Sequence, residues 1–386
     1  MQKLIYVINA YIALIIYIFS KSKKNIWLIG GHNGMLYTDN SKVFYEYILD
    51  EHKEINIYWI IDKKSSINTQ IRGEKIIKGS IKNYLYFYNS QVNLFSDTFN
   101  SDIAPLAFIL PCIRAIYFKR YKVFLNHGRI AFNKVPTFSY LVQKIKDSIY
   151  KSYDLATAST KLEKLAMVGN GIKEGNIEIT GSARDDKLYN IKTKEQSILI
   201  SPSWRGWLYE NHSLKDTQYF DNYTKLLSDK KLNSYLKKNN IQIYFYLHHM
   251  FHKFYDEFKE YDNNQIKILE KDSELSQYIK TSNLLITDYS SVCADFYYLK
   301  KPVIFFQFDK DEYSKKIGSY INLKNDKFGE IGYNSSDIID ILIKTIERDY
   351  IISPSQENGE KFFINFIDKD NCKRIYNTIK ERKGIQ

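Results

Sequence analysis

Short, continuous apolar runs alternate with longer polar stretches along the chain from Ile26 to Phe306. Runs of a few residues that are rich in Ile, Val, Leu, Tyr and Phe are typical of strands buried on both faces of a parallel sheet. They form two series along the chain. We predict strands at Ile26–Ile29, Ile55–Ile61, Val92–Phe95, Val123–Leu125, Leu155–Ala158 and Ile177–Thr180, and then at Ile198–Ile200, Ile241–Leu247, Ile266–Leu269, Leu284–Thr287 and Val303–Phe306.

Helical patterns lie between the predicted strands, and the stretch from Asp337 onward is also predicted to be helical. This strand–helix alternation indicates βαβ units and a doubly wound α/β fold. The polar, lysine-rich stretch Asp186–Gln196 separates the two series, so we predict one domain over residues 25–190 and a second over residues 191–386. Examples of the predicted helices are Ser41–Leu49, Lys161–Val168, Tyr219–Leu236 and Val292–Leu299.

Residues 1–24 form a separate N-terminal segment. No charged residue occurs from Leu4 to Phe19, and Lys21, Lys23 and Lys24 follow. A membrane-spanning helix needs about 20 apolar residues, so a span is the least favoured interpretation. No cleavage site typical of a secretory signal follows Phe19. The segment is either a first helix buried in the fold or an interfacial helix with its lysines at the lipid headgroups. The second interpretation predicts a peripheral protein on the cytoplasmic face of the cell membrane.

Composition narrows the partners and the compartment. The formal net charge is +12, from 56 Lys and Arg against 44 Asp and Glu. This balance favours anionic partners, namely a phosphorylated substrate, an anionic membrane surface or nucleic acid, although a solvated lysine-rich surface explains it as well. The three cysteines, Cys112, Cys293 and Cys372, lie far apart without a CxxC pattern. We therefore expect neither a disulfide framework nor a zinc site, and a reducing compartment.

Candidate chemistry follows the predicted strands, because ligands of open α/β sheets bind beyond the carboxyl ends of the strands. Hydroxyls, imidazoles and arginines are concentrated there. The segments concerned are Gly30-Gly31-His32-Asn33-Gly34, Asn126-His127-Gly128-Arg129, Gly181-Ser182-Ala183-Arg184-Asp185-Asp186, Ser201-Pro202-Ser203-Trp204-Arg205, His248-His249 and Asp288-Tyr289-Ser290-Ser291. The first segment is either a tight turn or a loop whose backbone approaches a ligand.

The histidines are the most informative of these residues. His127 stands between a strand and a glycine, where it is either a general base near neutral pH or a structural turn residue. His248 and His249 directly follow a strand, so their side chains are expected to point in opposite directions. Together with His252 they suggest a metal site, but no carboxylate or cysteine accompanies them, and we predict no metal there.

Phosphate-binding features are present, whereas nucleotide-binding loops are absent. Ser290 and Ser291 precede a predicted helix, whose N-terminus either binds phosphate or is simply capped by them. Arg205 is either a phosphate ligand or a surface arginine. Asp309-Lys310-Asp311 is more typical of a solvated turn than of a metal-binding triplet. No G-x-x-x-x-G-K-[ST] motif occurs, and no G-x-G-x-x-G follows the first strand, so kinase, NTPase and dinucleotide-binding functions lose support.

Taken in order, these motifs resemble the CDP-glycerol glycerophosphotransferase family, whose members prime or polymerise teichoic acids and related capsular polymers. The resemblance covers residues 26–350. It rests on Asn126-His127-Gly128, Thr180-Gly181-Ser182 with Arg184 and Asp186, Ser201-Pro202-Ser203-Trp204-Arg205, Leu247-His248, Thr287-Asp288-Tyr289-Ser290-Ser291 with Asp295-Phe296, Lys301-Pro302-Val303-Ile304-Phe305 and Asp309 with Asp311-Glu312-Tyr313.

The resemblance implies a GT-B-like fold, with two Rossmann-like domains facing a central cleft and no bound metal or other cofactor. It implies that His127 is the general base on the acceptor hydroxyl, and that His248 is a second essential histidine near the donor phosphates. The family commonly has proline after that second histidine, so His249 also remains a candidate. The implied donor-binding residues are Ser201, Ser203, Arg205, His249, Asp288, Ser290 and Ser291, and the implied acceptor-side or structural loop residues are Gly31, Asn33, Gly128, Arg129, Gly181 and Arg184.

The expected reaction is transfer of glycerol phosphate, or a related polyol phosphate, from a CDP-linked donor to a lipid-linked or polymer acceptor, with release of CMP. Two alternatives remain. One is another GT-B transferase that uses CDP-ribitol or a nucleotide sugar. The other is a basic protein that binds nucleic acid or anionic lipid, but the basic residues are not concentrated on one element and no nucleic-acid motif occurs. We therefore expect no nucleic-acid partner.

Overall fold

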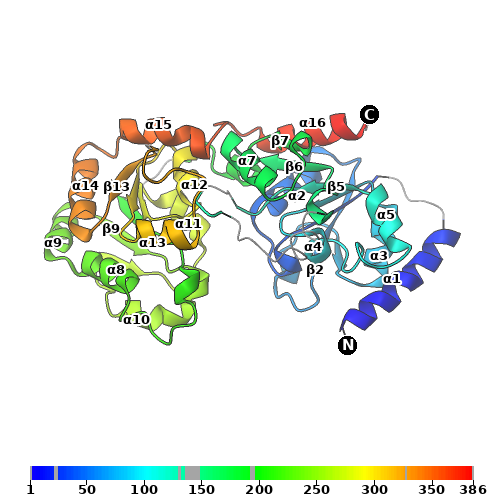
Figure 1. The fold of residues 1–386 in the computed structure, drawn as a ribbon, viewed down its shortest axis with the longest axis horizontal. Helices are drawn as coiled ribbons and strands as arrows, with labels where there is room; N and C mark the ends of the chain where they lie inside the picture. The colour runs from blue at the N-terminus through cyan, green and yellow to red at the C-terminus, as the bar shows by residue number, and fades with distance from the viewer. Residues whose placement is uncertain are drawn as a thin grey trace. The chain divides into compact units, whose positions relative to one another are not determined.

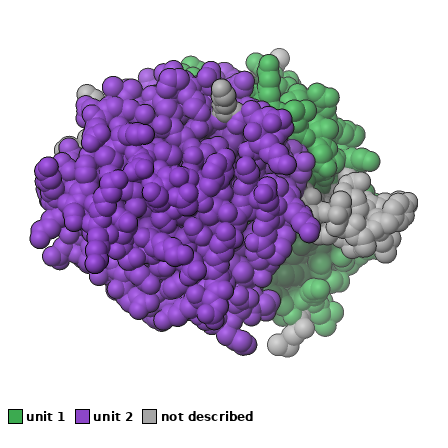
Figure 2. Space-filling model, turned by 60° about the vertical axis from the view of Figure 1, so that its left-hand side comes forward, with its two compact units in different colours: residues 1–129, 137–187, 368–386 green, residues 130–136, 188–367 purple. Residues whose placement is uncertain are grey.

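The computed structural model describes residues 2–20, 25–128, 132–134, 148–191, 196–326 and 328–384. The chain divides into two compact units, coloured separately in Figure 2. Unit 1 comprises residues 1–129, 137–187 and 368–386, and unit 2 comprises residues 130–136 and 188–367.

Unit 1 is built on a parallel sheet with the strand order β3-β2-β1-β4-β5-β6-β7. The strands are β1 (Ile26–Gly30), β2 (Asn56–Ile61), β3 (Lys75–Ile77), β4 (Val92–Phe95), β5 (Tyr121–Phe124), β6 (Leu155–Ala158) and β7 (Ile177–Ile179). The α-helices are α1 (Gln2–Phe19), α2 (Asp39–Glu51), α3 (Ile81–Asn89), α4 (Phe99–Asp102), α5 (Ile113–Lys119), α7 (Lys161–Gly169) and α16 (Asn371–Lys383) (Figure 1).

Unit 2 holds a second parallel sheet, with the order β10-β9-β8-β11-β12-β13. Its strands are β8 (Ser197–Ile200), β9 (Gln242–Phe245), β10 (Ile266–Ile268), β11 (Leu284–Thr287), β12 (Val303–Phe306) and β13 (Glu330–Gly332). Its α-helices are α8 (Gln218–Ser228), α9 (Lys230–Asn239), α10 (Tyr255–Lys259), α11 (Leu275–Thr281), α12 (Cys293–Tyr298), α13 (Lys310–Lys316), α14 (Ser335–Glu347) and α15 (Pro354–Phe363). Both sheets have the doubly wound architecture that the strand–helix alternation predicts.

The central strands explain why the apolar runs are continuous. Every residue of β1, β4, β8, β11 and β12 is buried, because helices cover both faces of each sheet. Trp27 and Trp59 fill the core of unit 1 on neighbouring strands, where Trp27 is opposite Ile57. All the predicted strands are present, with boundaries shifted by a few residues.

Several elements differ from the sequence-based prediction. The edge strands β3 and β13 were not predicted, because three residues carry too little periodicity. The single helix predicted over Tyr219–Leu236 is wrong. Asp229 ends α8 in an extended conformation and caps α9, accepting a hydrogen bond from the Leu232 N–H at 2.8 Å.

The C-terminal boundary of the second domain also needs correction. The helix α16 packs on α2 in unit 1, beside residues 183–187, although it follows unit 2 in sequence (Figure 1). Asp186 explains the attachment, since its carboxylate accepts hydrogen bonds from the backbone N–H groups of Asn371 and Cys372 at 3.0 and 2.9 Å. The first unit is therefore discontinuous in sequence.

The N-terminal helix α1 has one side packed on unit 1 and one exposed apolar side. Its inner side packs on α3, with Ala10 and Ala13 buried, and its carbonyl at Ala10 accepts a hydrogen bond from the Tyr88 hydroxyl at 2.8 Å. Asn9, the one amide in the apolar run, donates to the Gly79 carbonyl at 2.9 Å. The outer side exposes Leu4, Ile5, Ile8, Ile12, Ile15, Ile16, Ile18 and Phe19. Among the described helices, only α1 has the length and apolar composition needed to cross a membrane. Lys21, Lys23 and Lys24 lie outside the described residues.

Candidate active site

The candidate site of unit 1 lies at the point where its strand order reverses. The chain passes from β1 to β2 on one side, and β4 then pairs with β1 on the other side. Loops leaving the carboxyl ends at such a switch point diverge and leave a crevice for ligands. The loop after β4 contributes Ser96 and Asp97, and the adjacent strand β5 leads through Leu125 and Asn126 to His127.

His127 is held by two acceptors from the loop after β4. Its Nδ1 atom lies 2.9 Å from the Oδ1 atom of Asp97 and 3.1 Å from the Ser96 carbonyl oxygen. Both partners accept hydrogen bonds, so Nδ1 carries the proton and Nε2 is the basic nitrogen of the neutral ring. The side chain is 53% exposed, so Nε2 remains accessible to a ligand.

The electrostatics of this pair favour the charged imidazole. The hydrogen bond that His127 donates to Asp97 raises the pKa of His127 to about 9, against the opposing effect of burial. Burial acts to raise the pKa of Asp97, but the hydrogen bond and charge of His127 outweigh it and lower that pKa. An Asp–His pair of this kind makes a stronger base than an isolated histidine.

A buried carboxylate fixes the loop that carries Asp97. Asp102 accepts hydrogen bonds from the backbone N–H groups of Ser96, Asp97 and Asn33 at 3.1, 2.8 and 3.0 Å. Burial, followed by the charge of Asp97, raises the pKa of Asp102 to about 6. Asp102 therefore ties the loop after β1 to the loop after β4.

Asn126 and Asn40 position the backbone on both sides of His127. The Asn126 side chain accepts from the His127 N–H at 2.9 Å and donates to the carboxylate of Glu163 at 2.8 Å. The Asn40 amide donates to the carbonyl of Asn126 at 2.9 Å. The space beside Gly128 is open, since a Cβ atom added there meets no atom within 4 Å. Arg129 lies outside the described residues.

The other acceptor-side candidates are mostly structural in this geometry. A Cβ atom on Gly31 would lie 2.5 Å from the Ser96 hydroxyl, so this glycine allows the loops after β1 and β4 to approach each other. Gly181 has a φ of +80° and abuts the side chain of Asn371 in α16. Asn33 donates its N–H to Asp102, and Arg184 lies 3.5 Å from the carboxylate of Asp39.

Unit 2 repeats the strand reversal between β8 and β11. The Ser203 N–H donates to Asp288 at 2.8 Å, and the Thr287 hydroxyl donates to the Ser201 carbonyl at 2.6 Å. The loops after β8 and β11 are thereby joined at the switch point, where ligands of such sheets bind. Ser201 is buried, whereas Ser203, Ser290 and Ser291 are partly exposed at the ends of these strands.

Arg205 is a buried structural cation. It is fully buried and forms ion pairs with Asp288 at 2.9 Å and Asp309 at 2.6 Å, and it also donates to the Ser203 carbonyl and hydroxyl at 2.9 Å. Burial opposes ionisation, but the two carboxylates raise the pKa of Arg205 above its usual value. Because Arg205 and Asp288, both expected to bind the donor, are buried and paired with each other, this geometry does not present them to a ligand. The two residues instead brace the loops that carry the serines.

His248 and His249 differ in burial, but their ring centroids lie only 4.3 Å apart, so the prediction that the two side chains point in opposite directions is wrong. His248 is partly buried, its ring stacks on Trp204 with 6.2 Å between centroids, and its Nδ1 accepts from the Met250 N–H at 3.3 Å. Burial, with the charges of His249 and His252, lowers the pKa of His248 to about 4. The ring is therefore neutral near pH 7 with its proton on Nε2, so that it can donate a hydrogen bond to a ligand. His249 is exposed.

Within the described ranges, no group of three or more His, Cys, Asp or Glu side chains is arranged to hold a metal ion. The two carboxylates of the Asp309-Lys310-Asp311 triplet differ in burial, since Asp309 is buried against Arg205 and Asp311 is exposed.

Asp97 and Asp102 are absent from the sequence-based candidates. Both follow β4. Asp97 comes two residues after the end of this strand, so a search of the residues that follow each predicted strand could have found it. Asp102 could not be found in this way, because its role depends on three backbone N–H groups that the folded loops bring together.

Two parallel sheets, each with polar loops at its switch point, define a GT-B-like α/β protein, as predicted. A family model described as CDP-Glycerol:Poly(glycerophosphate) glycerophosphotransferase matches residues 12–381. The chain belongs to this family, which confirms the resemblance seen in the motifs.

Curated relatives include enzymes of teichoic acid synthesis. The chain is 28% identical to the minor teichoic acid biosynthesis protein GgaB of Bacillus subtilis over 93% of its own length and 40% of the relative's. It is 24% identical to a teichoic acid glycerol-phosphate transferase of Staphylococcus aureus over 83% of each chain. It is 26% identical to the ribitol-phosphate polymerase TarL of S. aureus, of which it spans 59%. The chain thus covers 40% of GgaB and 59% of TarL, which is less than two thirds of each protein.

Solved structures agree on the fold. The wall teichoic acid polymerase TagF, in its H548A form, superposes with a TM-score of 0.72 over 99% of this chain and 97% of that one, at 17% identity. A complex of S. aureus MnaA with UDP superposes with a TM-score of 0.58 over 94% of this chain and 98% of that one, at 14% identity.

Proposed function

We propose that this protein transfers glycerol phosphate, or a related polyol phosphate, from a CDP-linked donor to a hydroxyl acceptor of a teichoic-acid-like or capsular polymer. In the proposed reaction, the acceptor oxygen attacks the β-phosphate of the donor, a P–O bond forms, and the bond to CMP breaks. The acceptor is lipid-linked or is the growing polymer itself. Family membership and the teichoic acid relatives support the donor and acceptor classes.

The Asp97–His127 pair is the observation that carries the proposal. Its Nε2, which has no hydrogen-bond partner among the described residues, lies beyond the carboxyl end of β5 and is suited to take the proton of an attacking hydroxyl. Asp97 keeps the ring in the required tautomer and stabilises the imidazolium that forms. We therefore assign His127 as the general base and Asp97 as its positioning residue.

Donor phosphates are assigned to unit 2. Ser203, Ser290 and Ser291 offer hydroxyls at the switch point, and neutral His248 offers an Nε2–H group without adding charge. Phosphoryl transfer depends largely on positioning and charge stabilisation, so several fixed donors fit this chemistry. His249 is kept as an exposed candidate for donor contact.

The test is CMP release by the purified chain from CDP-glycerol and CDP-ribitol, with and without a lipid-linked acceptor. Both donors belong in the assay, because the relatives include glycerol- and ribitol-phosphate enzymes. His127→Ala is expected to abolish acceptor-dependent release while CDP-glycerol still binds. His212→Ala, an exposed histidine in unit 2, is the matched control. Equal activity of the His127 variant and the parent would refute the assignment.

We also propose that α1 holds the protein peripherally on the cytoplasmic face of the membrane. One side of the helix is fixed to unit 1 and the other presents apolar side chains to the surroundings, which is the arrangement of an interfacial helix. Replacing Ile8 and Ile15 by serine is expected to release the protein from vesicles of any lipid charge. Unchanged flotation with vesicles would contradict this attachment.

A further inference from the structure

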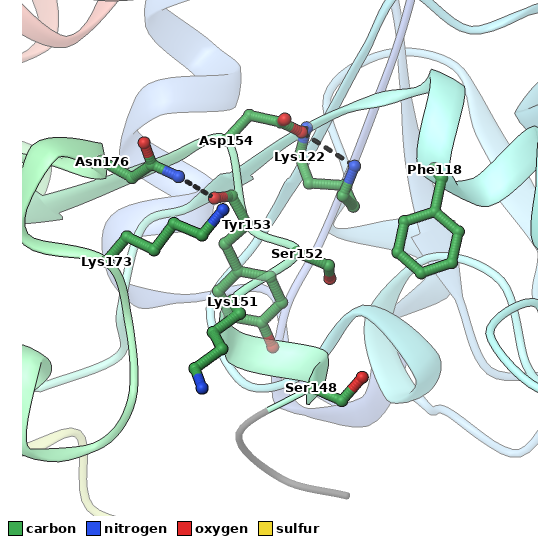
Figure 3. Close-up of a pocket in the computed structure, with 9 residues that line it drawn as sticks. All are labelled: Phe118, Lys122, Ser148, Lys151, Ser152, Tyr153, Asp154, Lys173 and Asn176. Carbon is green, nitrogen blue, oxygen red and sulfur yellow. Dashed lines mark hydrogen bonds and ion pairs between the residues drawn. The ribbon is translucent and has the colours of Figure 1, made fainter.

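A cavity in unit 1 lies away from the candidate active site. It has a volume of about 570 Å³ and is lined by Phe118, Lys122, Ser148, Lys151, Ser152, Tyr153, Asp154, Lys173 and Asn176 (Figure 3). Its volume is within the range of ligand pockets. Lys122 is the second residue of β5, and Asp154 and Asn176 precede β6 and β7. The cavity thus lies at the amino ends of these strands, whereas His127 follows the carboxyl end of β5.

The cavity carries an excess of positive charge. Lys122 is buried and satisfied, because it pairs with Asp154 at 2.8 Å and donates to the Arg120 carbonyl at 2.6 Å. Lys151 and Lys173 are exposed, and neither forms an ion pair within the described parts of the chain. Figure 3 shows that they come from two different segments and that Phe118 stands across from them. Exposed lysines on one side of the cavity and an apolar side chain on the other favour an anion that is attached to an apolar body.

The position of the cavity indicates the source of that anion. The Tyr11 hydroxyl of α1 donates to the carbonyl of Pro111, just before α5 begins. Phe118, near the end of α5, lines the cavity, and both it and Ile109 are exposed. A seven-residue helix spans about 10 Å. The cavity therefore opens about one short helix away from the apolar helix α1, which is within reach of the headgroups of a bilayer that holds α1.

We propose that this cavity binds the phosphate headgroup of an anionic phospholipid, with Lys151 and Lys173 as its ligands and Phe118 against the lipid. The inference rests on the proposed membrane attachment of α1 and goes beyond the proposed reaction. Headgroup binding at the amino ends of the strands leaves the opposite edge of the sheet, with His127, free for the acceptor.

Vesicle flotation of the full chain tests the proposal, with vesicles of phosphatidylcholine alone and vesicles that also contain phosphatidylglycerol. Lys151→Gln combined with Lys173→Gln is expected to weaken binding to the anionic vesicles about tenfold and to leave the neutral vesicles unaffected. Lys237→Gln with Lys238→Gln in α9, which removes the same charge from exposed sites in unit 2, is the control and is expected to change binding by less than about twofold.

A filling variant distinguishes a pocket from general surface attraction. Ser148 is exposed and lines the cavity, so Ser148→Trp narrows it without changing its charge. Weaker binding to anionic vesicles by both this variant and the lysine pair supports the proposal. If only the lysine-pair variant loses binding to anionic vesicles, or if neither variant does, the proposal is overturned. Saturable binding of free glycerol phosphate or inorganic phosphate, with vesicle binding independent of Ser148, also overturns the lipid assignment. The variant with Ile8 and Ile15 replaced by serine is expected to lose binding to both vesicle types. A failure of the α1 attachment can therefore be distinguished from a failure of the headgroup site.

Discussion

Replacing Asp97 by asparagine tests the core of the proposed mechanism. In the native pair, Asp97 raises the pKa of His127 to about 9 from its ordinary value of 6.5. At pH 7.5, a pKa of about 9 leaves only about 3% of the ring neutral, whereas 6.5 leaves about 90%. The native enzyme is therefore expected to gain activity as the pH rises, with the midpoint of its kcat/KM profile near pH 9.

The asparagine variant removes the charge and retains most of the geometry. The Ser96 carbonyl at 3.1 Å still accepts the Nδ1 proton, so the tautomer is preserved. The midpoint of the kcat/KM profile is expected to fall toward pH 6.5, and the plateau to fall about 10²-fold because the base is weaker and less firmly held. A midpoint that stays near pH 9 in the variant would show that His127 is not the titrating base. Asp272→Asn, at an exposed position in unit 2, is the matched control.

The same pair links pH to stability. Since the folded-state pKa of His127 is raised, its contribution to stability is fully present below about pH 6.5 and is lost as the pH rises through about 9. The side chain is half-exposed, so the contribution is reduced by solvent. Urea unfolding across this pH window is expected to show a decline in the native protein that Asp97→Asn lacks.

Three further predictions concern the supporting residues. Arg205→Met is expected to lower the free energy of unfolding by about 3–5 kcal/mol, because Asp288 and Asp309 remain buried without their cation. In urea unfolding, a change below about 1 kcal/mol would contradict a structural role for these buried ion pairs. His248→Gln is expected to raise the KM for CDP-glycerol, and since burial lowers the pKa of His248 to about 4, that KM should stay constant in the native enzyme from pH 8 down to about 5. Asp102→Ala is expected to destabilise unit 1 by about 1–3 kcal/mol through three unpaired N–H groups and to reduce turnover, and unaltered melting and turnover would rule out its bracing role.

The sequence predicted the architecture because the central strands are buried on both faces. Continuous apolar runs such as Ile198–Ile200 and Val303–Phe306 have few other interpretations once helical patterns separate them. The short edge strands are less distinctive, and β13 includes a glutamate and a glycine. The return of α16 to unit 1 depends on Asp186, which contacts Asn371, a residue far later in the sequence. No local sequence pattern encodes such a long-range contact.

The candidate site was predicted in part. The structure places His127 and His248 just after β5 and β9, where the sequence predicted strand ends. Strand-end position does not distinguish a side chain that faces a ligand from one that is enclosed. Arg205 illustrates the difference, since its motif is adjacent to serines yet its guanidinium is buried between carboxylates from two other loops. Burial of a charged group depends on the tertiary fold, and sequence position alone carries no signal for it.

The two histidines show how sheet order decides chemistry for one residue type. His127 and His248 both follow a strand, and the family resemblance implies a general base for the first and a residue near the donor phosphates for the second. β5 pairs with β4, so His127 meets the carboxylate of Asp97 and its pKa rises. His248 follows β9, and burial, followed by the charges of His249 and His252, lowers its pKa. The same residue type thus provides, at one position, a base that can accept a proton and, at the other, a neutral hydrogen-bond donor that can approach a phosphate. The difference lies in which loop the adjacent strand supplies. Exchanging these environments, for example by placing a carboxylate beside His248, is expected to charge that ring and to make its contribution to donor binding depend on pH between about 5 and 8.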